Sequence, residues 1–163
     1  MLVLAAAALL FSCSKDPKEE VPSGQFDYMG TMEVIYFDVN YPSPETVFTV
    51  MYDQEAGKAE LLLHQVKFVP MMPVTLDILV PDITAKASDG KVVLTGNEII
   101  PLTYPARIEY DRYMVTDLTG TIDGDKLTLS LKFGDYPTTV EGTLVEKAGK
   151  VPKQGIKRLV PVS

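Results

Sequence analysis

The sequence contains no tryptophan, one histidine and one cysteine, and each scarcity excludes a class of site. With His64 alone, the chain cannot build a metal or catalytic site that needs two histidines. With Cys13 alone, it cannot form a disulfide within itself, so its folded part has to be stable through its core. Phosphate-binding glycine loops are also missing, because neither a Gly-x-Gly-x-x-Gly nor a Walker pattern occurs.

Basic residues are fewer than acidic ones, and they are unevenly placed. The chain has 15 Lys and Arg against 22 Asp and Glu, a net charge of −7. Five basic residues follow Glu146 in a stretch without acids, namely Lys147, Lys150, Lys153, Lys157 and Arg158. The rest of the chain therefore has ten basic and 22 acidic residues, a charge of −12, which disfavours nucleic-acid binding. We expect residues 147–163 to be a solvated basic tail.

The first twelve residues are apolar and uncharged, and they end at Cys13 before a polar run. This run has the length of a signal-peptide core and is too short for a permanent membrane-spanning helix. Leu10-Phe11-Ser12-Cys13 resembles the lipobox of bacterial lipoproteins, in which the cysteine is acylated and becomes the first mature residue. The usual basic segment before the apolar run is missing, so the expected start codon lies upstream or the sequence is truncated. We expect a signal peptide at 1–12, a lipid on Cys13 and a polar flexible tether over 13–24.

Beyond Gly24, apolar residues recur with a period of two, and turn residues interrupt them about every ten residues. The clearest strand is 126–133, in which Leu and Phe alternate with Thr, Ser and Lys. It follows Asp123-Gly124, a dipeptide suited to a type I′ hairpin turn. Residues 61–66 are an ambiguous run that could also form one helical turn. The other predicted strands are 26–37, 46–52, 58–68, 74–84, 91–100, 114–122 and 138–145, with 106–112 as an optional ninth.

The predicted turns between these strands contain Pro42-Ser43-Pro44, Glu55-Ala56-Gly57, residues 70–73, Ser88-Asp89-Gly90 and Gly134-Asp135-Tyr136-Pro137. Eight antiparallel strands in chain order, each with one apolar face, close most economically into an up-and-down barrel without exposed edges. The predicted fold is therefore an all-β, eight-stranded, calycin/lipocalin-like barrel over residues 25–146. A two-sheet β-sandwich is the alternative.

Several segments of this pattern resemble a known family. They are Tyr28-Met29-Gly30-Thr31-Met32, Lys67-Phe68, residues 71–74 and 78–83, Asp89-Gly90 and residues 118–129. Together they resemble the calycin-like β-barrel domain of Bacteroidetes lipoproteins, a lipocalin-related group. The resemblance covers roughly residues 25–145 and implies a barrel without an established reaction. The Gly-x-Trp signature of lipocalins is absent here.

Two groups of residues are candidates for binding. An eight-stranded barrel is either filled by side chains or holds one small ligand. If it is hollow, we expect a hydrophobic ligand to contact apolar residues that face the interior, namely Met32, Leu61, Leu63, Met114, Leu118, Leu129, Leu131 and Phe133. Tyrosines near loops in the C-terminal half, Tyr104, Tyr110, Tyr113 and Tyr136, could instead contact a glycan or a partner protein.

Catalytic and metal sites are not expected. The chain lacks a Gly-x-Ser-x-Gly elbow, and His64 lies in an apolar run where a structural role is the more common one. Asp123 and Asp125 fit a polar hairpin turn, because a calcium site needs more oxygen ligands. We expect no cofactor, and a hydrolase is the least favoured alternative.

The function predicted from the sequence is therefore a binding module in the cell envelope. The lipid on Cys13 is expected to hold it at the outer membrane or cell surface of a Gram-negative bacterium, because acidic residues soon after the acylated cysteine accompany surface export in the resembling lipoproteins. The leading prediction is a barrel that holds a small hydrophobic ligand. The alternative is a solid barrel that displays a surface to a partner protein or glycan.

Overall fold

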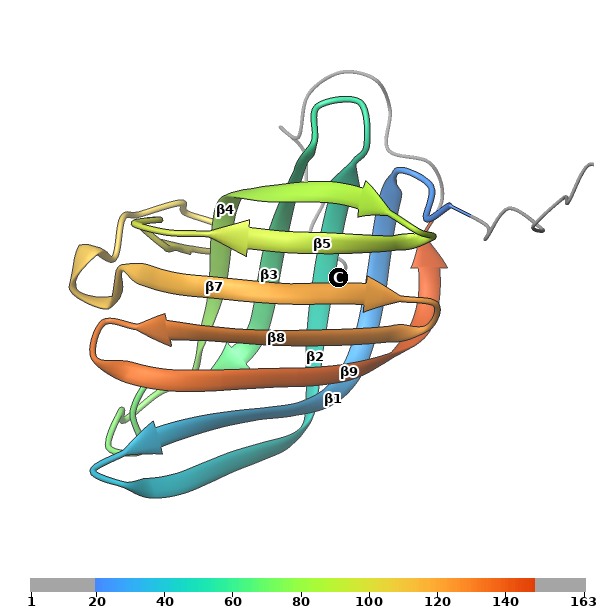
Figure 1. Cartoon of the computed structure of the whole chain (residues 1–163). Helices are drawn as coiled ribbons and strands as arrows, with labels where there is room; N and C mark the ends of the chain where they lie inside the picture. The colour runs from blue at the N-terminus through green and yellow to red at the C-terminus, as the bar shows by residue number, and fades with distance from the viewer. Residues whose placement is uncertain (1–19, 149–163) are drawn as a thin grey trace, which may run out of the picture.

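Nine antiparallel strands run through residues 20–148, the part of the chain that the computed structural model describes (Figure 1). Eight of them form a closed barrel in chain order, because β3 pairs with β4 and the last strand, β9, pairs with the first, β1. Among the described strands, the short β6 pairs only with β4, and it is not part of the closed barrel. The strands are β1 Gly24–Tyr36, β2 Val39–Asp53, β3 Lys58–Val66, β4 Leu76–Ser88, β5 Lys91–Gly96, β6 Leu102–Thr103, β7 Val115–Asp123, β8 Lys126–Phe133 and β9 Tyr136–Ala148.

The predicted up-and-down barrel is confirmed, and so is the strand at Lys126–Phe133. Residues 61–66, where one helical turn was an alternative, belong to β3. The optional ninth strand at 106–112 is wrong. That segment holds an isolated bridge at Glu109 and the start of the 3₁₀ turn η1 (Asp111–Tyr113), while the ninth strand is Leu102–Thr103.

Tight two-residue turns join several neighbouring strands. Phe37 and Asp38 both have positive φ, as do Asp89 and Gly90, which is the pattern of type I′ turns. The turn predicted at Asp123-Gly124 is shifted by one residue. Asp123 pairs with Lys126, so the turn residues are Gly124 and Asp125, of which only Gly124 has a positive φ, the pattern of a type II′ turn.

The segment Pro42-Ser43-Pro44 was predicted to be a turn, but it lies inside β2. β2 pairs with β3 only from Phe48 onward, so its first part is paired with β1 on one side and exposed on the other. Proline lacks a backbone donor and is tolerated on such an edge, where it also discourages pairing with other chains. The two prolines therefore protect an open edge instead of ending the strand.

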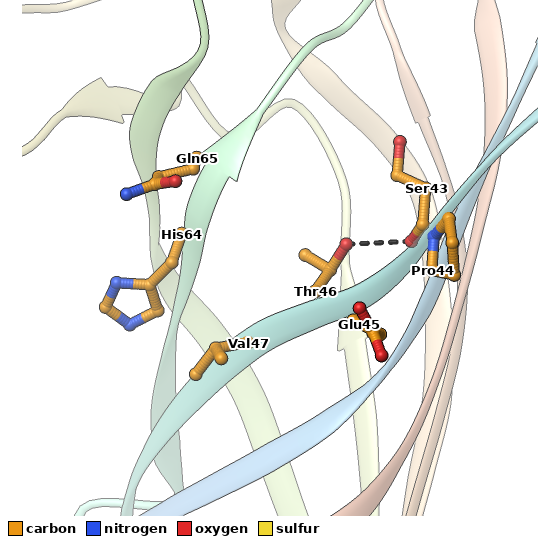
Figure 2. A pocket seen from close by; sticks show the side chains of 7 residues that line it. All are labelled: Ser43, Pro44, Glu45, Thr46, Val47, His64 and Gln65. Carbon is orange, nitrogen blue, oxygen red and sulfur yellow. Dashed lines mark hydrogen bonds between the residues drawn. The ribbon is translucent and has the colours of Figure 1, made fainter.

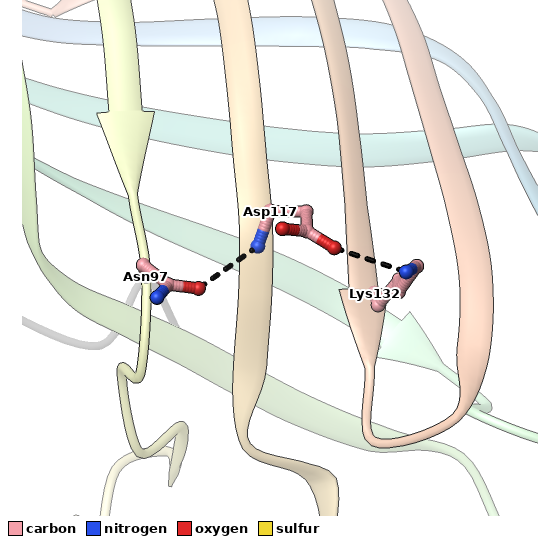
Figure 3. A network of polar contacts seen from close by, with 3 residues as sticks. All are labelled: Asn97, Asp117 and Lys132. Atoms are coloured by element: carbon pink, nitrogen blue, oxygen red, sulfur yellow. Dashed lines mark hydrogen bonds and ion pairs between the residues drawn. The ribbon is translucent and has the colours of Figure 1, made fainter.

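Within the described residues, the register shifts in four strand pairs, and such β-bulges bend the barrel wall. The pairs are β1–β2, β1–β9, β3–β4 and β7–β8. The β7–β8 bulge contains Asp117, whose φ is +52°. Figure 3 shows how polar contacts hold it: the backbone N–H of Asp117 donates to Oδ1 of Asn97 at 3.2 Å, and its carboxylate lies 2.9 Å from Nζ of Lys132. The bulge in β7 is thus held to β8 and to the residue that follows β5.

The barrel has two different ends. At one, the turn end, short connections (54–57, 89–90 and 124–125) lie beside the start of β1. At the other, the loop end, the turns 37–38 and 134–135 lie beside the longer connections 67–75 and 97–114, toward the left of Figure 1. The approach to β1 is fixed at the turn end, because the backbone N–H and Nε2 of Gln54 donate to Ser23 and Glu20.

Candidate functional site

The residues predicted to line a ligand cavity face the barrel interior, with one exception. Seven of the eight belong to a single buried cluster and are at most 2% exposed: Met32, Leu61, Leu63, Leu118, Leu129, Leu131 and Phe133. Met114 precedes β7 and is partly buried. Large rings fill the space between them, because Tyr28, Phe48 and Tyr52 belong to the same cluster and are at most 2% exposed.

This burial favours a filled interior. A cavity large enough for a small ligand would leave part of its lining side chains uncovered by other atoms, whereas these side chains are at most 2% exposed. Binding of a small hydrophobic ligand stays a prediction. Packing of the interior side chains against one another is by itself a sufficient reason for the alternation of apolar residues in the sequence.

The loop end of the barrel is closed by aromatic rings in mutual contact. Phe68 stacks on Tyr113 with centroids 4.4 Å apart, and Phe133 lies 4.6 Å from Phe68. Tyr110 lies 5.1 Å from Tyr113, which is itself 6.4 Å from Tyr136. Three of the four tyrosines singled out from the sequence, Tyr110, Tyr113 and Tyr136, are therefore brought together here.

The aromatic contacts continue from this buried plug to the surface. Tyr36 lies 5.3 Å from Tyr136, and its other neighbours are Phe37 at 4.5 Å and Tyr41 at 6.3 Å. The Tyr36 hydroxyl donates to Sδ of Met71, from the connection between β3 and β4, at 4.0 Å. A continuous path of rings thus runs from the core to the rim of the barrel.

Around the partly buried Tyr36, large and mainly apolar side chains are exposed at this rim. We call Tyr36, Phe37, Val39, Tyr41 and Met71 the rim patch. Phe37 is 82% exposed and Met71 is 78% exposed, more than any other large hydrophobic residue in the described chain. Val39 is the register partner of Tyr36 and is half exposed. Aromatic and methionine side chains of this kind are enriched at protein interfaces.

The rim patch was not predicted from the sequence. The segment Tyr36-Phe37-Asp38-Val39-Asn40-Tyr41 contains three aromatic residues in six, which is the signal that was available. The period-two pattern assigned Phe37 to a strand, because phenylalanine is not a typical turn residue. Only the register of β1 and β2 shows that it lies at the tip of a hairpin.

Tyr104 is separate from the other predicted tyrosines. It packs with Leu102 against a second small cluster on the outside of the barrel, formed by Met51, Leu62 and Leu79. Tyr104 is therefore not part of the aromatic loop end.

At the loop end, the environment changes the pKa of Tyr113. Burial raises the pKa of the Tyr113 phenol, while the nearby Arg112 guanidinium, 5.7 Å from the ring centroid, opposes this shift. The tyrosines Tyr110, Tyr136 and Tyr36 raise it further. The Tyr113 phenol therefore stays neutral at ordinary pH, and the rings of the loop end present apolar faces with hydroxyl groups at their edges.

His64 has a structural partner on the outer wall. Its Nε2 lies 2.9 Å from Oγ1 of Thr49, and the same hydroxyl donates to Oδ1 of Asp27 at 2.7 Å. Because the Thr49 hydroxyl donates its hydrogen to the Asp27 carboxylate, its oxygen accepts a hydrogen bond from the N–H at Nε2 of His64. The arrangement runs histidine to threonine to aspartate across β3, β2 and β1, so it orients the ring and does not activate a nucleophile.

A pocket of about 470 Å³ opens where β2 and β3 diverge, and it is lined by Ser43, Pro44, Glu45, Thr46, Val47, His64 and Gln65. Figure 2 shows His64 and Gln65 directed to one side of their strand, across from Ser43 and Pro44. The hydroxyl of Thr46 donates a hydrogen bond to the carbonyl oxygen of Ser43 at 2.8 Å. The lining side chains do not converge on a common point, so the loop end is the stronger candidate.

The predictions on metal binding, the lipid anchor and the basic tail stay predictions. Within residues 20–148, no three His, Cys, Asp or Glu side chains group so as to hold a metal ion, and no helix is long and apolar enough to span a membrane. Cys13, the signal peptide and most of the basic tail lie outside the described residues, although Lys147 and Ala148 belong to β9.

Comparison of the chain with protein-family models, with curated proteins and with solved structures finds no match. The barrel and its rim patch are therefore the features from which a function can be inferred.

Proposed function

We propose that this protein is a lipid-anchored envelope or surface lipoprotein whose solid barrel binds a partner protein through the rim patch. The proposal takes the second of the two functions predicted from the sequence, because burial of the interior supports it. It assigns the tyrosines of the loop end a new role, since they pack behind the rim and hold its exposed members in place. Membership of the calycin-like family stays a prediction.

Phe37 is the observation that carries the proposal. It occupies the first position of a type I′ turn with a φ of +48°, where asparagine or glycine is favoured and a bulky side chain is strained. Its ring is 82% exposed, so burial does not compensate for this strain. A strained and exposed aromatic residue at a hairpin tip is well suited to anchor in a partner's apolar pocket.

The chain direction suits display of the rim patch. β1 begins at the turn end, where Gln54 holds Ser23 and Glu20, and it ends at the loop end beside Phe37. Ten residues, 14–23, separate Cys13 from Gly24, and this stretch spans at most about 40 Å when fully extended. The proposed anchor and the rim patch are thus attached to opposite ends of the barrel.

A photo-crosslinking residue at position 37 tests the proposal in intact envelopes. We expect it to give a discrete protein adduct. In a second protein, a crosslinker at position 41 should give an adduct with the same partner, and adding Phe37→Asn to this second protein should weaken its adduct at least tenfold. Asparagine fits the left-handed turn, so this variant should be at least as stable as the original protein. Loss of binding then cannot be attributed to unfolding.

Val145→Asn is the matched control, because Val145 is exposed to 58% but lies on β9 toward the turn end. Val145→Asn should leave the adduct from position 41 unchanged. A crosslinker placed at position 145 should give no adduct with this partner. Equal adducts from crosslinkers at positions 37 and 145, or an undiminished adduct in the protein with Phe37→Asn, would contradict the proposal. A native mass spectrum showing bound lipid in the purified barrel would instead favour the small-ligand function.

A further inference from the structure

The connection between β5 and β7 folds back on the outer wall of the barrel. Its residues 101–110, which we call the strap, form a small hairpin: the N–H of Thr103 donates to the carbonyl of Ile108, and that of Tyr110 to the carbonyl of Pro101, both at 2.8 Å. Outside this hairpin, the bridge between Ile99 and Val115 fixes its base. The strap is therefore a local unit that can move without opening the barrel.

The strap contacts the wall through its backbone and its side chains. Leu102 and Thr103 pair with β4, and the N–H of Tyr104 donates to the carbonyl of Asp77 at 2.9 Å. The strap covers three outward-facing apolar side chains, Met51 of β2, Leu62 of β3 and Leu79 of β4, which are 5%, 3% and 0% exposed. An uncovered strip of this kind would face water, whereas the strap encloses it with Leu102 and Tyr104.

Glu60 lies on the same outer face of β3, next to Leu62 along the alternation, and its side chain is only 9% exposed. Its Oε1 lies 3.8 Å from Nη2 of Arg107, which belongs to the strap. Its Oε2 is buried without a hydrogen-bond partner. A buried carboxylate held by one long ion pair is poorly compensated for the loss of its hydration.

The wall opposite Glu60 adds negative charge. The β3–β4 register shifts between Ala59 and Leu61, which places the bulge residue Asp82, with a φ of +55°, across from Glu60. Besides Arg107 and Asp82, the charged or titratable groups on the elements around Glu60 are Lys58 and His64 of β3, Tyr41, Glu45, Tyr52 and Asp53 of β2, Asp77 and Lys86 of β4, and Tyr104, Glu109 and Tyr110 of the strap.

We propose that the strap is a proton-controlled cover of the Met51–Leu62–Leu79 strip, closed when Glu60 is protonated and released as Glu60 ionises. This inference goes beyond the proposed function, because it concerns a different face of the barrel. The cover opens toward neutral pH, where ionised Glu60 lacks a partner for Oε2, and closes in acid, where the neutral carboxyl is readily buried.

The direction follows from linkage. Burial raises the pKa of the Glu60 carboxyl above its ordinary value of 4.5, Arg107 partly opposes this rise, and Asp82 adds to it. The closed strap therefore binds the Glu60 proton more tightly than the open strap does. Raising the pH from about 4.5 through the elevated pKa must then shift the equilibrium toward the open strap.

Hydrogen–deuterium exchange measures this equilibrium directly, as protection factors corrected for the pH dependence of intrinsic exchange. Between pH 4.5 and 8, we expect the protection of the strap amides, those of Thr103, Tyr104 and Tyr110, to fall severalfold. The amides of Ala85 and Gly134, which bond within the rest of the barrel, should keep theirs. An apolar fluorescent dye should bind more strongly as the strap amides lose protection.

Three variants separate the proton switch from general loosening. Glu60→Gln, a neutral residue of the same shape, should keep the strap protected at every pH. Arg107→Gln should move the midpoint to higher pH, because it removes the positive charge that favours ionised Glu60. Glu109→Gln is the matched control, an exposed acid on the strap, and should behave like the original protein.

Strap protection that is independent of pH, or that rises with pH, in the original protein would overturn the inference. So would a Glu60→Gln variant that retains the original pH dependence. If that variant fails to fold, the original protein and Arg107→Gln still decide the question, because an unchanged midpoint in Arg107→Gln also contradicts it.

Discussion

Gly30 of β1 and Gly142 of β9 are register partners where the first and last strands close the barrel. A Cβ atom on Gly30 would clash with the carbonyl oxygen of Glu141 and would lie 2.6 Å from Cα of Gly142. On Gly142, a Cβ would lie 3.0 Å from that of Tyr28. Closure therefore depends on two strands that approach more closely than side chains permit.

Gly30→Ala should destabilise the protein by about 2–4 kcal/mol, because the obstructing atoms belong to the backbone and cannot rotate away. Urea unfolding at pH 7 measures this difference. Gly96→Ala is the control, since its new Cβ would meet chiefly Cδ1 of Ile99, the end of a flexible side chain. Equal losses in the two variants would contradict the assignment of Gly30 to barrel closure.

The hydrogen bonds of Thr49 predict the tautomer of His64. Because the Thr49 hydroxyl donates to Asp27, neutral His64 should carry its proton on Nε2, which ¹⁵N chemical shifts of the ring report directly. Thr49→Val keeps the shape, removes both bonds and should cost about 1–2 kcal/mol. A dominant Nδ1–H form in the original protein would show that this chain of bonds does not hold in solution.

Alkaline pH should weaken the barrel through Tyr28. Burial, with a contribution from Asp125, raises the pKa of this core phenol to about 12. Above pH 10 the unfolded chain loses a proton that the folded chain retains, so stability falls as the pH rises from 10 toward 12. The two-unit difference corresponds to at most about 3 kcal/mol.

Tyr28→Phe should flatten this decline in urea unfolding measured at intervals from pH 9 to 12. Tyr41→Phe, which changes a tyrosine at the exposed rim, should leave the slope as it is in the original protein. Identical slopes in all three proteins would remove Tyr28 as the cause.

The bulge at Asp117 should accept glycine but not a β-branched residue. Glycine adopts a φ of +52° without strain, and the exposed ion pair with Lys132 contributes little, so Asp117→Gly should change stability by less than about 1 kcal/mol. Asp117→Val should cost about 1–2 kcal/mol, because valine is strained at positive φ. Thermal unfolding of the two variants distinguishes these outcomes, and a valine variant as stable as the glycine variant would contradict them.

Much of the fold could be predicted from local pattern. Strands such as Lys126–Phe133 are bounded by turn residues and alternate strictly, so their periodicity predicts both extent and buried face. The turn at Asp89-Gly90 follows from the same information, because these residues tolerate positive φ.

The errors occur where the fold outweighs local preference. Proline at positions 42 and 44 predicts a turn, yet an unpaired strand edge accepts it. Phe37 predicts a strand, yet the pairing of Tyr36 with Val39 forces it into the turn. Both outcomes depend on which strand lies alongside, and that information is absent from a short window of sequence.

The candidate site was predicted only in part for the same reason. Tyr110, Tyr113 and Tyr136 do meet at one end of the barrel, but Phe68, from a distant connection, completes their packing. Glu60 gave no signal at all. Its burial follows from the strap, which folds over the wall from more than forty residues further along the chain.

The pairing of β1 with β9 also determines when the protein can fold. Gln25 pairs with Ala148, so the barrel has no closed form until more than 120 residues have been delivered. Non-local pairing of this kind slows folding and leaves sheet edges open in the meantime. A chain threaded across a membrane from its N-terminus would have its last strand arrive last. For the export that we propose this order is useful, because a barrel that cannot close early cannot block its own passage.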